Sequence, residues 1–269
     1  MSKKKNKFVD AHCHINLTYY KNPEVIKEIV NASSTNRVEF FINNGGHPKE
    51  NIEVIELAKK YPVFKACIGI HPEAGKNAND YQEVEKLLLE NRQYISGIGE
   101  IGLDYYYEDG LDKNRQIDSF KNQIKLADKY NLPAVIHIQD KVDSFQAYQD
   151  VYSILKEYPN LKCMLHTFAG NTEWAQKFLE FKNLYFSFSG VITFGSSQNT
   201  RDVIKLIPLE RILTETDSPY LRPHPYINEM NEILNTVVYV SYYLAGLKNI
   251  GMDKFVDRVN KNLRILFNL

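Results

Sequence analysis

The sequence predicts an α/β fold, a single-domain (β/α)8 barrel of the TIM type. Two observations support this prediction. Short apolar runs of strand length alternate with longer segments in which apolar residues recur at three- and four-residue steps. Six residues that can bind a metal stand late in these runs or directly after them, and such barrels build their active sites at the carboxyl ends of the strands. A doubly wound open sheet is the alternative fold.

Eight apolar runs have the composition of buried strands. They cover residues 7–14, 38–43, 63–70, 95–103, 134–138, 162–166, 184–188 and 212–216. Between them, segment 118–130 repeats its apolar residues at helical spacing, and Pro133 then marks a stop before the next strand. Segment 50–60 has the same spacing, and residues 228–269 have the pattern of helices that pack on the outside of the sheet.

The composition fits one large domain. The chain has 269 residues, of which 43% are hydrophobic and 25% are charged. We expect a short basic tail at residues 1–7 and a single domain over residues 8–269. The 33 basic and 33 acidic residues give a formal net charge of zero, which argues against nonspecific coating of nucleic acid. Any nucleic-acid substrate must therefore be held locally.

The cysteines and the apolar runs indicate where the protein resides. Cys13, Cys67 and Cys163 each lie in an apolar run, and an odd count favours buried free thiols in a reducing compartment. No run approaches the ~18 apolar residues of a membrane span, and the basic start lacks the apolar core of a signal peptide. The sequence thus predicts a soluble cytoplasmic protein that does not engage a membrane, and it identifies no stable protein partner.

The first apolar run carries a histidine pair. Because side chains alternate across a strand, Asp10, His12 and His14 share one face and Cys13 lies on the other. Two histidines two residues apart can bind one metal ion from a strand end, and Asp10 is placed to orient one of the rings. Alone, the same spacing also fits two hydrogen-bonded surface histidines.

Four further candidates follow later runs. Glu100 lies in a glycine-rich strand, where a buried carboxylate needs a partner such as a metal ion or an arginine. His137 stands late in the fifth run, and His166 ends the sixth. Asp217 follows the eighth run, where it could bind a metal and accept a proton from water, or could cap a helix. A mixed cluster of histidines and carboxylates is typical of metal-dependent hydrolases.

Several residues near the strand ends are candidates for substrate contact. His71 ends the third run, where a contact with a substrate phosphate and simple packing are both reasonable interpretations. Tyr105 and Tyr220 could stack bases at the barrel mouth, although aromatic residues at strand ends more often pack in the core or at the rim. His224 lies in a loop beside proline and is a weaker candidate.

Six ordered blocks extend over most of the chain. They are FVDAHCHI at 8–15, GIHP at 69–72, GIGEIGLDYY at 97–106, LPAVIH at 132–137, HTFAG at 166–170 and LTETDSPYL at 213–221. Together they resemble the TatD-type metal-dependent deoxyribonucleases, within the wider amidohydrolase-like barrels, over residues 8–262. The resemblance implies a TatD-like (β/α)8 hydrolase domain that cleaves phosphodiester bonds in DNA, often from an end.

The resemblance also implies a centre of two divalent ions. Its ligands would be divided between the two ions: His12, His14 and Asp217 for one, His137 and His166 for the other, with Glu100 as the bridge. Glu100 and Asp217 would also serve catalysis, Asp217 as the general base. The chain departs from the family pattern at Gly195 and over residues 227–233, in loops expected to contact substrate.

The sequence therefore predicts a phosphodiesterase with DNA or an oligonucleotide as its substrate and Mg²⁺, Mn²⁺ or Zn²⁺ as its ions. Imidazole-rich ligand sets favour Zn²⁺ and Mn²⁺, whereas Mg²⁺ prefers oxygen but is abundant in cells. One alternative is an amidohydrolase or lactonase acting on a small substrate. Many such enzymes bridge their metals with a carboxylated lysine on the fourth strand, where this chain has Glu100 and no lysine. A non-catalytic, metal-stabilised binding protein is the other alternative.

Overall fold

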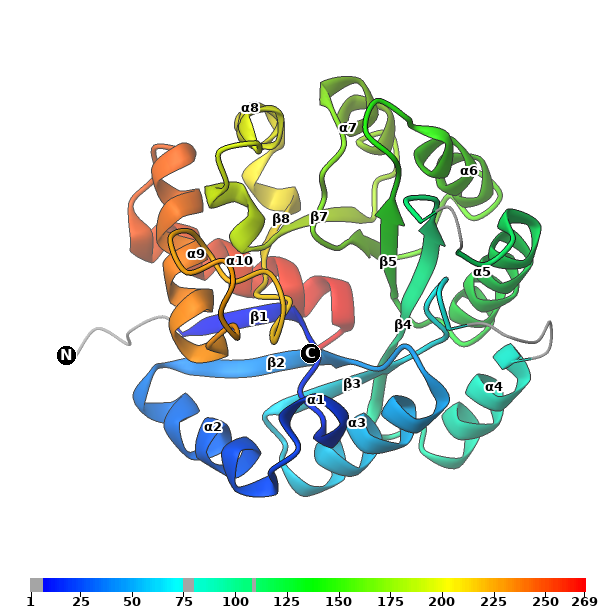
Figure 1. The fold of residues 1–269 in the computed structure, drawn as a ribbon, viewed down its shortest axis with the longest axis horizontal. Coiled ribbons are helices and arrows are strands. Elements are labelled where there is room, and N and C mark those ends of the chain that lie inside the picture. The colour runs from blue at the N-terminus through cyan, green and yellow to red at the C-terminus, as the bar shows by residue number, and fades with distance from the viewer. Residues whose placement is uncertain (1–6, 75–79, 108–109) are drawn as a thin grey trace.

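Eight parallel strands form the centre of the protein, with helices around them (Figure 1). The computed structural model describes residues 7–74, 80–107 and 110–269. The predicted basic tail, apart from Lys7, lies outside the described residues. The strands are β1 Phe8–Cys13, β2 Val38–Asn44, β3 Phe64–Ile68, β4 Ile95–Asp104, β5 Ala134–Gln139, β6 Cys163–Leu165, β7 Leu184–Phe188 and β8 Ile212–Thr214.

The strands pair in sequence order from β1 to β8, and every pairing is parallel. The segment after β8 then returns to β1. There the Asp217 amide donates to the His12 carbonyl at 2.9 Å, and the His14 amide donates to the Ser218 carbonyl at 2.7 Å. The sheet therefore forms a (β/α)8 barrel, and this order rules out the doubly wound open sheet.

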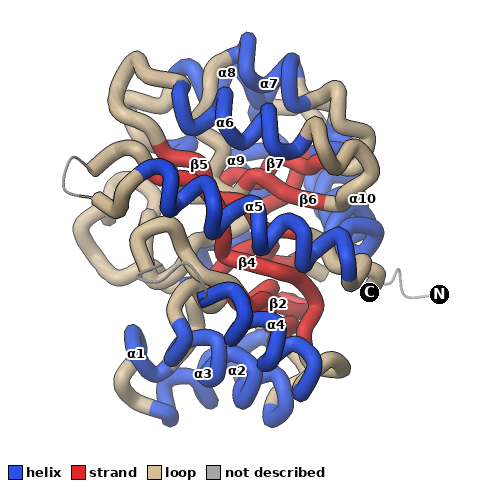
Figure 2. The backbone as a smooth tube through the Cα atoms, turned by 90° about the vertical axis from the view of Figure 1, so that its right-hand side faces the viewer, coloured by secondary structure: helices blue, strands red, loops and turns tan. Residues whose placement is uncertain are grey.

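Helices connect successive strands and cover the outside of the sheet (Figure 2). They are α1 Leu17–Tyr20, α2 Pro23–Thr35, α3 Pro48–Lys60, α4 Asp80–Glu90, α5 Lys113–Lys129, α6 Gln146–Leu155, α7 Thr172–Phe178, α8 Gln198–Leu206, α9 Ile233–Leu247 and α10 Met252–Phe267. There are also two short 3-10 helices: η1 Gly190–Thr193 follows β7, and η2 Leu209–Arg211 directly precedes β8. Among the described residues, no helix combines the length and apolar character needed to cross a membrane.

Helix α5 illustrates how local sequence sets an element's bounds. The Asp112 side chain accepts hydrogen bonds from the amides of Asn114 and Arg115, which caps the start of the helix. The predicted face is buried, with Phe120 and Ile124 fully enclosed against the barrel. Similar local signals operate at α2 and α3, which both begin with proline.

Two apolar clusters hold the barrel together. The larger one lies between the strands and the outer helices, and the smaller one packs α2 and α9 against the first strands. Helices α9 and α10 contact β1 and β8, where the sheet closes. All three cysteines are free and buried, as predicted. The hydrophobic layers therefore leave the carboxyl ends of the strands as the place where buried polar residues gather.

Candidate metal centre

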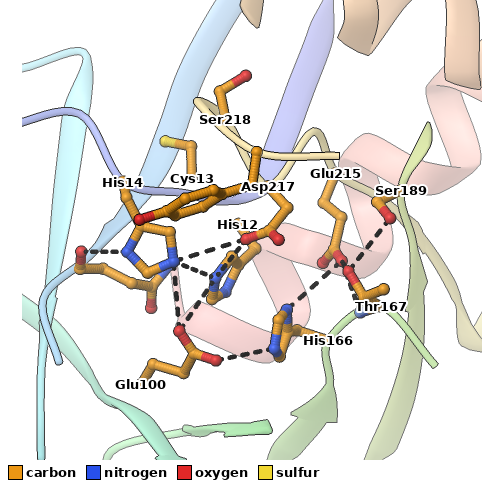
Figure 3. Close-up of polar contacts among 12 residues, drawn as sticks. His12, Cys13, His14, Glu100, His166, Thr167, Ser189, Glu215, Asp217 and Ser218 are labelled. Atoms are coloured by element: carbon orange, nitrogen blue, oxygen red, sulfur yellow. Dashed lines mark hydrogen bonds and ion pairs between the residues drawn. The ribbon is translucent and has the colours of Figure 1, made fainter. Parts of the chain in front are cut away.

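The six predicted ligands converge at the carboxyl ends of the strands. His12 lies in β1 and His14 directly after it, Glu100 lies in β4, and His137 lies in β5. The two remaining residues, His166 and Asp217, follow β6 and β8. The alternation predicted for β1 holds, because the Nε2 atoms of His12 and His14 lie 3.0 Å apart. Figure 3 shows the imidazoles of His12, His14 and His166 beside the Glu100 carboxylate.

Glu100 stands between two pairs of imidazoles. Its Oε2 atom lies 3.5 Å from His12 Nε2 and 3.2 Å from His14 Nε2. Its Oε1 atom lies 3.0 Å from His137 Nδ1 and 2.8 Å from His166 Nε2. The two oxygens of one buried carboxylate thus face different pairs of ligand-type nitrogens.

Asp217 adds a second carboxylate on the His12 and His14 side. Its Oδ1 atom lies 3.3 Å from His12 Nε2 and 3.5 Å from His14 Nε2. The residue adopts a left-handed backbone conformation (φ 55°), which aspartate tolerates better than most residues. The hydrogen bond from the Asp217 backbone amide to the His12 carbonyl holds that turn against β1.

Asp10 has a different role from the predicted one. Its carboxyl accepts hydrogen bonds from the His12 amide at 3.2 Å and from the Thr216 amide and hydroxyl at 3.0 and 2.7 Å. It therefore joins the backbones of β1 and of the segment after β8, whereas we predicted that it would orient an imidazole. Burial raises the pKa of Asp10 to about 8, although the bonds from Thr216 and His12 oppose that rise.

In two imidazoles, the ring nitrogen that does not face Glu100 has a hydrogen-bond partner. His14 Nδ1 lies 3.1 Å from the Asn44 carbonyl oxygen. His137 Nε2 lies 3.1 Å from Asp104 Oδ2. The carbonyl can only accept a hydrogen bond, so it favours a proton on His14 Nδ1 and leaves Nε2 free to bind a metal. His137 has the opposite arrangement, with Nδ1 facing Glu100.

The centre contains ionised carboxylates beside imidazoles with a raised pKa, as at His14 and His166. Burial alone would raise the pKa of Glu100. The charge of His166 and the hydrogen bonds with His12 and His137 instead hold that pKa well below its usual range. Bonds from His12 and His14 likewise outweigh burial and lower the pKa of Asp217. Burial would lower the pKa of His14, but its bonds with Asp217 and Glu100 raise the pKa to about 10. A divalent cation can replace the protons that balance this charge.

His71, a candidate for substrate contact, lies beside the centre. Its Nε2 atom is 3.6 Å from Glu100 Oε1, and its ring centroid is 4.6 Å from that of His137. Burial is the largest effect on the pKa of His71 and lowers it to about 3, so the imidazole is neutral. A neutral ring can offer a lone pair to a cation or donate an N–H to an anion.

A cavity of about 490 Å³ opens above these residues and includes five of the six predicted ligands in its lining. Tyr19, Tyr107 and Tyr220 stand at its wall, and the rings of Tyr19 and Tyr220 are 5.5 Å apart. The Tyr19 hydroxyl donates to Glu50 Oε1 at 3.0 Å. Within the described part of the chain, no lysine or arginine lines this cavity.

Two predicted substrate contacts lie elsewhere. Tyr105 is 4% exposed, and its hydroxyl donates to Asp150 Oδ2 at 3.0 Å, away from the cavity lining. His224 lines a separate cavity beside Tyr226. Sequence reasoning missed Asp104, although alternation along β4 places it on the same face as Glu100 and places Tyr105 on the opposite face.

The loops that depart from the family pattern have different surroundings. Gly195 borders open space, so a side chain at this position would meet no other part of the described protein. In residues 227–233, Asn231 is buried and its side-chain amide donates to the carbonyls of Thr216 and Tyr220. Asn231 therefore holds the segment that carries Asp217. The nearby Arg222 pairs with Glu229 at 2.8 Å.

The donor set suits divalent metal ions. Three groups of histidine and carboxylate atoms each gather within 4.8 Å, and two of them contain Glu100. They are His12, His14 and Glu100; His71, Glu100 and His137; and His12, His166 and Glu215. Nitrogen and oxygen donors of this kind suit Zn²⁺ and Mn²⁺, and carboxylate oxygens also accept Mg²⁺. Glu215 was not among the predicted residues.

Fold and site together define the protein's class, a metal-dependent hydrolase built on a (β/α)8 barrel. The family model described as TatD related DNase matches residues 9–268, so the chain belongs to the TatD family. The fold and the family predicted from the sequence are therefore both confirmed.

Curated relatives and a solved structure agree with this assignment. The uncharacterized metal-dependent hydrolase YabD of Bacillus subtilis is 32% identical, and the match covers 97% of this chain and 98% of YabD. The uncharacterized metal-dependent hydrolase YcfH of Escherichia coli K12 is 31% identical, with 97% and 96% covered. The crystal structure of the TatD homologue YJJV from Escherichia coli K12 superposes with a TM-score of 0.87 at 25% identity, covering 97% of this chain and 98% of that one.

Proposed function

We propose that this metal-dependent hydrolase is a phosphodiesterase acting on DNA or oligonucleotides through two divalent ions. The observation that carries the proposal is the position of Glu100, whose Oε2 and Oε1 atoms face different pairs of imidazoles. One carboxylate that faces two ligand sets is the arrangement needed to bridge two ions. The family description as TatD related DNase supports DNA as the substrate.

In this proposal the ligands fall into two sets. His12, His14 and Asp217 hold one ion; we name these residues the His12 half. His137 and His166 would hold the other; we name these the His137 half. Glu100 belongs to both. The unit that carries this centre would be residues 8–269 as one hydrolase domain.

The chain's residues divide the reaction between them. Bound divalent ions would neutralise phosphate charge and lower the pKa of water. Asp217 is ionised at neutral pH, because its contacts with His12 and His14 lower its pKa, and its carboxylate can accept the proton of the attacking water. His71, with its neutral imidazole, is placed to donate a hydrogen bond to a phosphate oxygen.

The cavity wall adds a second line of support for a nucleic-acid substrate. Tyr19, Tyr107 and Tyr220 offer aromatic faces on which bases can stack, at about 1–3 kcal/mol per base. Because no lysine or arginine lines the cavity among the described residues, the bound ions would be the main partners of the scissile phosphate. In this proposal Tyr105 and His224 do not contact that phosphate, because neither residue lines the cavity.

Cleavage of end-labelled DNA tests the proposal. Purified protein loaded with Mn²⁺ or Mg²⁺ should shorten single- or double-stranded DNA, and chelation should abolish the activity. If the metal-loaded protein binds DNA tightly but releases no product, a metal-stabilised binding role replaces catalysis. A panel of cyclic amides and lactones tests the small-substrate alternative. Turnover of those compounds without DNA cleavage would contradict the proposal.

A further inference from the structure

Each imidazole of the centre has an inner nitrogen that faces a carboxylate and an outer nitrogen. A metal-binding histidine needs an acceptor for the proton on its outer nitrogen, because that proton fixes the tautomer. The Asn44 carbonyl serves His14, and Asp104 serves His137, each at 3.1 Å. The outer nitrogens of His12 and His166 are both Nδ1, and neither has a hydrogen-bond partner although both are buried.

The two unpartnered rings lie together. His12 and His166 stack with centroids 4.1 Å apart and an interplanar angle of 18°. Glu215 is the acidic residue grouped with both, with one ligand-type atom of each residue within 4.8 Å of the others. Its Oε1 atom is 3.7 Å from His166 Nδ1, within ion-pair range but beyond a hydrogen bond (Figure 3).

Thr167 holds one carboxylate oxygen of Glu215, and the other oxygen has no hydrogen-bond partner. Thr167 donates to its Oε1 atom through the amide at 2.6 Å and the hydroxyl at 2.5 Å. The Oε2 atom is buried without a partner, and the residue is fully enclosed. A buried carboxylate oxygen without a donor is costly, and so is a buried imidazole N–H without an acceptor. The free carboxylate oxygen could therefore accept a hydrogen bond from the unpartnered imidazole nitrogens.

We propose that Glu215 is a positioning residue shared by His12 and His166, whose Nδ1–H groups its carboxylate accepts when their Nε2 atoms bind metal. This inference rests on the proposed two-ion centre. For His166, closing the 3.7 Å between Nδ1 and Glu215 Oε1 to a hydrogen bond requires a shift of less than about 1 Å. For His12, the grouped atoms of the ring and of Glu215 lie within 4.8 Å of each other. Because His12 belongs to the His12 half and His166 to the His137 half, Glu215 would link both halves from behind the ligands.

A third cation at the same position is chemically less favourable. His12 and His166 already direct Nε2 toward the carboxylates of the centre. Binding a further ion through Nδ1 would require each ring to lose both of its protons. A carboxylate acceptor requires only the neutral imidazole that a metal ligand already needs.

Metal titration of the metal-free protein with Mn²⁺, in competition with a chelating indicator, tests the proposal. Glu215→Gln keeps an oxygen for Thr167 but presents a donor to the imidazoles. We expect the wild type to bind two ions and the variant to bind both roughly 10- to 100-fold more weakly. Glu210→Gln is the matched control, because Glu210 is exposed and pairs only weakly with Arg258 at 3.8 Å, and it should match the wild type.

Each other outcome is decisive. Equal affinities in Glu215→Gln and the wild type would overturn the inference, and so would weakening of one ion alone. Loss of a third equivalent, with two unchanged, would assign a cation to Glu215 instead. A wild type that binds fewer than two ions would refute the two-ion centre itself.

A second measurement on the wild type avoids the question of whether the variant folds. Long-range ¹H–¹⁵N correlation spectra of the Zn²⁺-loaded protein report which ring nitrogen carries the proton. We expect protons on Nδ1 of His12 and His166 and on Nε2 of His137. Protons on Nε2 of His12 or His166 would contradict the role of Glu215.

Discussion

The two halves of the centre share Glu100 but differ in charge. In the His12 half, two imidazoles meet two carboxylates, since Asp217 Oδ1 joins Glu100 Oε2. In the His137 half, two imidazoles meet a single carboxylate oxygen of the centre, with the neutral His71 nearby. Because Glu100 is shared, Asp217 gives the His12 half one more negative charge than the His137 half. We therefore expect the His12 half to bind its ion more tightly, and the His137 half to leave more room for substrate.

The largest expected effect comes from removing the residue that both halves share. Glu100→Ala should lose both ions and reduce DNA cleavage by roughly 10³-fold or more, because each half loses a carboxylate oxygen. Metal content and cleavage of end-labelled DNA measure the effect, with Glu210→Gln as the control. Retention of wild-type cleavage would show that Glu100 does not bridge metals.

Removing one histidine from each half separates them. His14→Ala and His137→Ala should each leave one ion bound, and cleavage should fall on the order of 10²- to 10³-fold in both, as expected when one of two cooperating ions is lost. Because the His12 half has two carboxylates, the ion remaining in His137→Ala should be the tighter one. Calorimetric titration compares the two affinities. The reverse order of affinity would refute the charge comparison.

A substitution at Asp104 perturbs the His137 half through the ring nitrogen of His137 that does not face Glu100. Its Oδ2 atom lies 3.1 Å from His137 Nε2, and it contacts no imidazole of the His12 half. Asp104→Asn should weaken one ion by roughly 10- to 100-fold and leave the other unchanged. The same titration provides the measurement. An equal fall in both affinities would contradict the assignment of Asp104 to the His137 half alone.

The smallest effect concerns pH. The carboxylates around His14 raise its pKa to about 10, so the metal-free ring is protonated at neutral pH and must release that proton to bind an ion. Metal affinity should therefore weaken as pH falls, by about tenfold per pH unit for each proton released. Calorimetry in buffers of different ionisation enthalpy counts the protons. Metal binding without proton release would contradict the charge state of the His12 half.

Sequence reasoning identified the barrel because strand runs and helical spacing are local signals. It also brought His12 and His14 together, since alternation along a strand needs no tertiary knowledge. The partners behind the ligands were harder to find. Asp104 lies 33 positions from His137, and Glu215 lies 48 positions from Thr167, so these contacts exist only once the barrel closes. Alternation along β4 would nevertheless have placed Tyr105 outside the cavity and Asp104 inside it.

The position of bound metal tests the two-ion centre most directly. A crystal of the protein soaked in Mn²⁺ would show anomalous-scattering peaks at the ions. We expect two peaks on either side of the Glu100 carboxylate, one among His12, His14 and Asp217 and one between His137 and His166. A single peak, or a pair of peaks that do not share Glu100, would contradict the bridged centre.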